Sequence, residues 1–177
     1  MLQSLFRRQA RRPAVLAAYE RIVERAREPH FYTAWGVPDT LDGRFEVLAL
    51  HAFLVLNRLK RDHAATADFA QELFDTMFAD LDRSLREMGA GDLGVGRRVK
   101  AMATGFYGRI AAYDRGLVEE AALMPALRRN LYGTTEPEEA QLAAVAVYTR
   151  RQAAALAAHP AQALLTGVVD FAPFGGP

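Results

Sequence analysis

The sequence predicts an all-α protein, a single-domain helical bundle of six or seven helices. Apolar residues recur at the spacing of a helix face along most of the 177-residue chain. Strand signals are weak, because strict alternation of apolar and polar residues is missing and isoleucine occurs only at Ile22 and Ile110. A chain of this length fits one domain with one core.

The first half of the chain predicts three helices. Pro13 suits the first turn of a helix that ends near Pro29. A second helix, capped by Asp39 or Thr40 and reaching to about residue 62, is apolar on most sides, which is typical of a helix at the centre of a bundle. The third helix spans about residues 64–88, and its apolar stripe contains Phe69, Leu73, Met77, Leu81, Leu85 and Met88.

The second half predicts three more helices. The stretch "GAGDLGVG" breaks the helical pattern, and a fourth helix follows over about residues 97–117. A shorter helix is kinked or ended by Pro125 and resumes through Leu131. "TTEPEEAQ" then signals a helix start, because it offers a threonine cap, Pro137 in the first turn and acids at the positive end of the helix dipole. This last long helix runs to about Ala158.

Both ends of the chain differ from the predicted helical domain at residues 14–172. Residues 1–13 form a basic segment in which Arg7, Arg8, Arg11 and Arg12 occur without an acid, beside Leu2, Leu5 and Phe6. This composition is typical of a flexible, solvated terminus, of a short segment that lies on a membrane surface, or of an organellar presequence. Residues 173–177 predict a loose tail. The longest apolar run, residues 47–56, is too short to span a membrane.

No catalytic or metal-binding set is evident. "GAGDLG" at residues 89–94 matches the pattern of dinucleotide sites, but a helix precedes it where that motif needs a strand, so an interhelical turn explains it better. The four histidines lack metal-ligand spacing, and His51 is interpreted as a core histidine with a hydrogen-bond partner. Cysteine is absent, and neither Ser4 nor Ser84 lies in a nucleophile turn. We therefore expect no cofactor, no metal and no enzymatic activity.

Charge is segregated along the second third of the chain. Residues 62–92 contain eight acids, among them Asp80 and Asp82, against two arginines. The next segment opens with Arg97, Arg98 and Lys100, joined later by Arg109. Cations in the first turn of a helix oppose its dipole. Two interpretations remain open: the cations bind a partner such as phosphate or an acidic surface, or they pair with the neighbouring acidic helix.

Two long blocks of sequence resemble a known family. "FYTAWGVPDTLDGRFEVLALHAFLVLNRL" and "FDTMFADLDRSLREMGAGDLGVGRRVKAMATGFYGRIAAYD" are similar to signature blocks of the ubiquinol–cytochrome c chaperone family. The resemblance covers about residues 14–172, and the chain resembles the bacterial branch, because mitochondrial relatives carry a long N-terminal extension.

The resemblance implies an all-α, non-enzymatic assembly chaperone for ubiquinol–cytochrome c reductase (complex III). Its implied partners are newly made cytochrome b or another complex III subunit, a small helical partner protein, and the ribosome near the tunnel exit. We expect a cytoplasmic protein, peripheral on the inner face of the cell membrane through its N-terminal segment, and no DNA binding. The alternative, from the arginine clusters alone, is a helical adaptor that binds ribosomal RNA or another polyanion.

The stretch "FYTAWGVPD" at residues 31–39 is the most unusual in the chain, with three aromatics before a glycine and a proline. It predicts either a packed corner or an apolar surface for a client. We expect a divided role, with Trp35 packed and with Phe31 and Tyr32 lining a groove. The residues expected to bind a client or partner are Phe31, Tyr32, Trp35, Val37, Pro38, Asp80, Asp82, Arg97, Arg98, Lys100, Tyr107 and Arg109.

Overall fold

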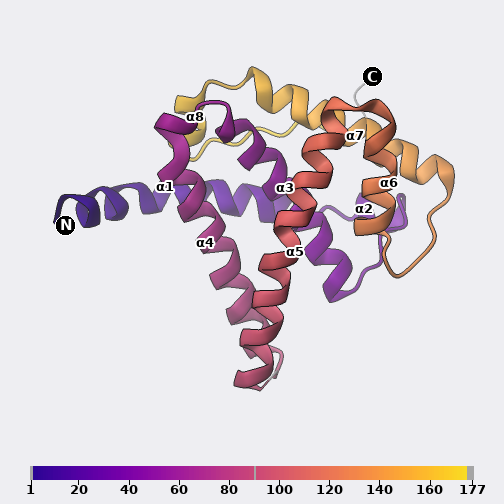
Figure 1. Cartoon of the computed structure of the whole chain (residues 1–177), viewed down its shortest axis with the longest axis horizontal. Coiled ribbons are helices and arrows are strands. Elements are labelled where there is room, and N and C mark those ends of the chain that lie inside the picture. Colours follow the sequence, from indigo (N-terminus) through magenta and orange to yellow (C-terminus); the bar gives the residue numbers. More distant parts are fainter. Residues whose placement is uncertain (1, 90, 175–177) are drawn as a thin grey trace.

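The computed structural model describes residues 2–89 and 91–174, and it confirms the predicted all-α class (Figure 1). Within these residues, six long helices and two short ones form the fold. The short helices were not predicted. The bounds are α1 Leu2–Ala26, α2 His30–Thr33, α3 Leu41–Lys60, α4 His63–Glu87, α5 Asp92–Val118, α6 Glu120–Leu131, α7 Glu139–Ala158 and α8 Ala161–Leu165.

The central position predicted for the second long helix is confirmed by α3. Every residue from Phe45 to Val55 is buried, so the middle turns of α3 have no solvent-facing side. The helix contacts α1, α4, α5, α6, α7 and α8. Thr40 caps it by accepting a hydrogen bond from the backbone N–H of Gly43 (3.1 Å). The other helices therefore build one core by laying their apolar faces on α3.

Helices α4 and α5 form a hairpin that projects from the rest of the body (Figure 1). The apolar stripe predicted for α4 is confirmed at its first five positions, which are buried. Met88, the sixth, is 57% exposed, because it lies past the end of α4 at the tip of the hairpin. The tip therefore presents a large apolar side chain to solvent.

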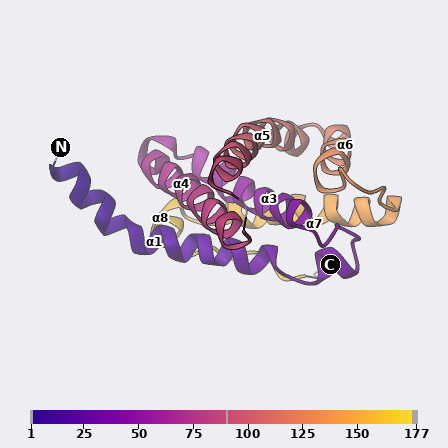
Figure 2. The same ribbon diagram turned by 90° about the horizontal axis from the view of Figure 1, so that it is seen from below.

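The predicted start of the first helix at Pro13 is wrong. α1 begins at Leu2 and continues through Pro13, although proline lacks the N–H that would bond to the carbonyl of residue 9. Long-range ion pairs explain the difference, because Arg11 bonds to acids of α4 that lie 57 and 61 residues further along the chain. Figure 2 shows the resulting long helix, whose N-terminal end reaches beyond the rest of the body.

The fourth predicted helix also begins earlier than expected. α5 starts at Asp92, so Gly94 and Gly96 lie inside the helix rather than in a turn. Interior glycines cost a helix roughly 1 kcal/mol each, and the burial of Val95 between them, at 1% exposure, offsets part of that cost. The turn is confined to the residues around Gly89, which has a φ of +83°.

The chain after α8 returns along α7 and is held there as far as Phe174. Gln152 of α7 donates a hydrogen bond to the carbonyl of Ala172 (2.9 Å) and accepts one from its N–H (2.7 Å). The carbonyl of Pro173 accepts from Arg151 (2.7 Å). Pro173 and Phe174 thus contact the body, and residues 175–177 of the predicted loose tail lie outside the described residues.

Candidate functional site

The segment at residues 31–39 is mainly a structural corner. Trp35 packs against the core, as expected, but Phe31 is buried instead of lining a groove. The Phe31 side chain is 0% exposed. Its ring centroid lies 5.2 Å from those of Trp35 and His51 and 5.3 Å from those of Tyr148 and Phe174. These five residues form the aromatic cluster. Phe31 therefore packs in the core and lines no groove, because α2 turns it inward against α3 and α7.

The other aromatic residues of this segment lie nearer to the surface. Trp35 is partly exposed and packs edge-on against His30, with ring centroids 4.7 Å apart. Tyr32 is partly exposed, but its hydroxyl donates to the carbonyl of Ala26 (2.8 Å), and burial raises its pKa to about 12. Both residues are thus only partly accessible to solvent.

Val37 and Pro38 complete the corner. Val37 is 2% exposed. Gly36 has a φ of +66°, which only glycine adopts readily. A Cβ atom on Gly43 would lie 2.0 Å from the carbonyl oxygen of Pro38, so the chain passes against the first turn of α3 with no room for a side chain. These residues therefore set the direction of the chain into α3.

His51 is a neutral core histidine, as the sequence predicts. Its Nδ1 lies 2.7 Å from the carbonyl oxygen of Val47, and its Nε2 lies 2.8 Å from the hydroxyl of Tyr148. A carbonyl can only accept, so Nδ1 carries the proton and Nε2 accepts from the tyrosine. Burial lowers the pKa of His51 to about 4. No ion is needed to satisfy this side chain.

An apolar groove lies between α3, α4 and α5 and contains Tyr107. Its volume is about 270 Å³. Tyr107 is 61% exposed, and its ring centroid lies 5.6 Å from that of Phe74. At one rim Asp114 accepts hydrogen bonds from Asn57 (2.7 Å) and Lys60 (2.8 Å). We call this the Tyr107 groove; its apolar lining includes Leu56, Ala70, Phe74, Tyr107 and Ile110.

Sequence reasoning missed Phe74 as part of this groove, although a signal was present. Phe74 lies one position off the apolar stripe of α4, next to the buried Leu73. A large aromatic beside such a stripe faces the edge of a helix interface, where part of its surface stays available. That position brings Phe74 under the exposed ring of Tyr107 from α5.

Arg109 lies on α5 in a second pocket, which α3, α5 and α6 enclose. It forms a two-pronged ion pair with the carboxylate of Glu46, in which Nε lies 2.6 Å from Oε2. The two side chains are only 20% and 10% exposed. Hydrogen bonding to Glu46 raises the pKa of Arg109, and the guanidinium also lies over the ring of Phe45. The guanidinium of Arg109 is therefore already bound to Glu46 and stabilises the fold.

The basic cluster does not lie in the first turn of its helix. Because α5 starts at Asp92, Arg97 and Arg98 come in the second turn, so the predicted conflict with the helix dipole does not arise. Arg98 pairs with Asp42 of α3 (2.7 Å) rather than with the acidic helix α4. Arg97 and Lys100 are exposed and have no ion-pair partner among the described residues.

The two acids singled out on α4 have local partners. Asp80 accepts a hydrogen bond from the Tyr19 hydroxyl (2.9 Å) and pairs with Arg83. Asp82 pairs with Arg86 (2.6 Å), which lowers its pKa. In the part of the chain that the structure describes, no group of three or more histidine or acidic side chains could hold a metal ion.

The predicted site residues thus do not form one site but lie in separate regions of the structure. The aromatics of residues 31–38 mark the corner before α3, Tyr107 marks the groove, and the cations lie along α5. Over residues 2–89 and 91–174, none of the helices has the length and apolar character needed to cross a membrane.

The fold and this surface define an all-α protein with an exposed apolar groove and a buried aromatic cluster. The chain belongs to the ubiquinol–cytochrome c chaperone family, whose sequence pattern matches residues 33–171.

Relatives and a solved structure are similar over nearly the whole chain. It is 29% identical over 162 residues to ubiquinol-cytochrome-c reductase complex assembly factor 1 of Xenopus laevis, covering 90% of this chain and 81% of the frog protein. The mouse protein of that name is 26% identical, and the match covers 90% of this chain but 55% of the mouse protein. The crystal structure of the Cbp3 homolog from Brucella abortus superposes with a TM-score of 0.83 at 39% identity, covering 98% of this chain and 97% of that one.

Proposed function

We propose that this protein is a non-enzymatic chaperone for the assembly of ubiquinol–cytochrome c reductase, and that it holds newly made cytochrome b. The observation that carries the proposal is the family match over residues 33–171, together with relatives that are assembly factors of this complex. The family assignment supports the assembly role, and the identity of the client is our inference.

The Tyr107 groove is the surface that fits such a client best. A membrane protein that has not yet been assembled exposes apolar segments, and these need an apolar surface that stays accessible. Tyr107 is the most exposed aromatic residue among the large apolar side chains of the described residues. Tyr107, Phe74 and Ile110 together offer apolar surface to a client. Each Å² of this surface that a client covers contributes roughly 25 cal/mol to the binding free energy. Aromatic anchors of this kind often carry most of the energy of an interface.

Of the other predicted contact residues, Tyr32 and Trp35 are partly exposed, and Arg97 and Lys100 are exposed without an ion-pair partner among the described residues. The edge of Trp35 lies beside the corner, and the two cations lie on α5. We assign Arg97 and Lys100 to a second contact, with an acidic protein surface at the ribosome or on the small helical partner. We propose that the protein acts at the inner face of the membrane, where cytochrome b is inserted.

The alternative function is an adaptor that binds ribosomal RNA or another polyanion. The observation that favours it is the same exposed pair of cations on α5. Arg98 and Arg109 do not add to this pair, because each already has an acidic partner. Binding to a polyanion should weaken steeply as salt rises, whereas an apolar grip on a client should not.

Deletion of the gene in the native organism tests the assembly role. We expect less assembled complex III, measured as b-type haem absorbance in membranes, with growth continuing on a fermentable or alternative route. Complementation with Tyr107→Ala should restore the complex poorly, and affinity capture should recover less cytochrome b. Val147→Ala is the matched control, because Val147 is 66% exposed on α7, away from the groove. Unchanged complex III in the deletion strain would refute the proposal.

A further inference from the structure

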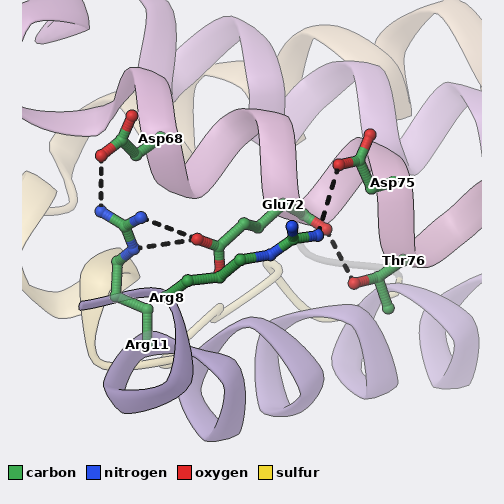
Figure 3. Close-up of polar contacts among 6 residues, drawn as sticks. All are labelled: Arg8, Arg11, Asp68, Glu72, Asp75 and Thr76. Carbon is green, nitrogen blue, oxygen red and sulfur yellow. Dashed lines mark hydrogen bonds and ion pairs between the residues drawn. The ribbon is translucent and has the colours of Figure 1, made fainter. Parts of the chain in front are cut away.

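The N-terminal part of α1 is held to the body by charge rather than by core packing. From Arg8 onward, where the structure describes the side chains of α1, the first buried residue is Val15, and of residues 8–14 only Arg11 and Ala14 are partly buried. Arg11 donates from Nη1 to Asp68 (2.8 Å) and from Nη2 to Glu72 (2.7 Å), and its Nε lies 3.2 Å from the same Glu72 oxygen. Figure 3 shows the side chain of Arg11 extending from α1 to these two acids of α4.

Arg8 adds a weaker contact in the same row. Its guanidinium lies 3.9 Å from Asp75, and the two side chains are 63% and 48% exposed. Arg12, the next cation of this segment, is exposed and has no ion-pair partner among the described residues. Exposed ion pairs are weak and are screened by salt, so the pair between Arg8 and Asp75 can be exchanged for another source of negative charge.

The N-terminal part of α1 and the facing part of α4 carry opposite charges, and this complementarity is confined to these parts of the two helices. Residues 1–19 contain four arginines and no acid, and residues 64–82 of α4 contain five acids and no lysine or arginine. The acids that receive the arginines are Asp68, Glu72 and Asp75, which we call the acidic latch. Within it, Glu72 is the most buried carboxylate, with a side chain 12% exposed.

Pro13 gives this segment a point at which it can bend. Proline removes one backbone hydrogen bond and crowds the preceding turn, so a helix bends most easily there. Residues 2–12, which carry the four arginines and precede Pro13, are called the N-terminal arm. The sequence of the arm also contains Leu2, Leu5 and Phe6. Basic residues interspersed with large apolar ones suit the interface of an anionic bilayer.

We propose that the N-terminal arm binds the surface of an anionic bilayer and that the acidic latch on α4 holds it back in the free protein. Lipid phosphates and the latch carboxylates compete for the same two guanidinium groups, those of Arg8 and Arg11. A membrane with enough negative charge releases the arm, which then tethers the helical body beside the bilayer. The inference rests on the membrane-side location proposed above and adds the device that controls it.

Cosedimentation of the full-length protein with vesicles tests the latch. The probes are vesicles of phosphatidylcholine alone and of phosphatidylcholine mixed with phosphatidylglycerol. Neutralising the latch, as Asp68→Asn, Glu72→Gln and Asp75→Asn together, should strengthen binding to the anionic vesicles at least about fivefold, since each basic residue at such a surface contributes about that factor. Binding to the neutral vesicles should not change. Arg8→Gln with Arg11→Gln should bind the anionic vesicles more weakly than the parent.

A second triple variant separates the latch from net charge. The substitutions Glu119→Gln, Glu120→Gln and Glu136→Gln remove three negative charges, as many as the latch variant does. These three residues lie around α6, away from α1. If this control gains as much lipid affinity as the latch variant, net charge explains the effect and the latch is refuted.

A label on the arm keeps the test decisive even if the latch variant is unstable. The chain has no cysteine, so Ser4→Cys carries a single environment-sensitive fluorophore in an otherwise native protein. We expect a shift in its emission with the anionic vesicles and none with the neutral ones. An unchanged emission with both, or a response to RNA in place of vesicles, overturns the lipid assignment. Neither result bears on complex III content in the deletion strain, so the two proposals fail separately.

Discussion

Truncation of Phe31 to alanine should be among the most destabilising single changes in this protein. The side chain is 0% exposed and its ring contacts four other members of the aromatic cluster. Removing a buried phenylalanine costs roughly 3–5 kcal/mol. Each aromatic contact adds about 0.5–1.5 kcal/mol beyond buried area. We therefore expect a loss near the upper end, about 4–5 kcal/mol, from a total that is typically about 5–15 kcal/mol.

Urea denaturation followed by far-UV circular dichroism measures this loss, and thermal melts give a second reading. For a chain of this size about 1 kcal/mol corresponds to about 2–4 °C, so the midpoint should fall by about 8–20 °C. Trp35→Ala should cost less than Phe31→Ala, because Trp35 is partly exposed. Val147→Ala, at an exposed position, should stay within about 0.5 kcal/mol of the parent. A Phe31→Ala protein that loses less than Trp35→Ala would show that the ring is not packed in this way.

Three further predictions concern charge. Arg109→Ala should lose about 3 kcal/mol in urea denaturation, because it leaves the carboxylate of Glu46 buried without a partner. Replacing Arg97 and Lys100 together by glutamine should change the stability by less than about 0.5 kcal/mol and lower the capture of an acidic partner. The pKa of His51 is lowered from 6.5 to about 4 in the folded protein. Between these two pH values the unfolded chain takes up a proton at His51 and the folded protein does not. The contribution of His51 to the free energy of unfolding is therefore complete above pH 6.5 and falls by about 3 kcal/mol towards pH 4.

Each of these predictions has a matched comparison. Arg115→Ala removes an arginine that pairs on the surface with Glu119 and should cost under about 1 kcal/mol, so an equal loss from both arginine variants would contradict the buried-pair argument. A clear drop in melting temperature for the glutamine pair would mean that those cations support the fold. For the histidine, the slope of stability against pH should flatten in His51→Gln and persist in His63→Gln, which changes an exposed residue. Identical slopes in all three proteins would rule out His51 as the cause.

The sequence could predict the helices whose burial is encoded locally. α3 is apolar on most sides and proved to be central, and the stripe of α4 proved to be buried from Phe69 to Leu85. α7 starts at Glu139, within the predicted stretch, but its cap is Glu138, in a capping box with Gln141, rather than the predicted threonine, and Pro137 precedes the helix. In each case the deciding residues lie within a few positions of one another.

The misplaced features depend on residues far apart in the chain. The passage of α1 through Pro13 is supported by acids of α4, and the early start of α5 places Val95 in the interior. The burial of Phe31 follows from contacts with Tyr148 of α7 and with Phe174, both more than 100 residues away. For the candidate site, the sequence indicated Tyr107, but the groove beneath it appears only when α3, α4 and α5 come together. Long-range contacts override local preference at these positions.

The fixed segment after α8 has a consequence for synthesis. Residues 166–174 are translated after every helix that they join, and Phe174 completes the aromatic cluster around Phe31. A nascent chain that still lacks these residues exposes the rings of Trp35 and Tyr148 to water, together with the unpaired amide of Gln152. The packing around Phe31 is therefore completed only after residues 166–174 have left the ribosome.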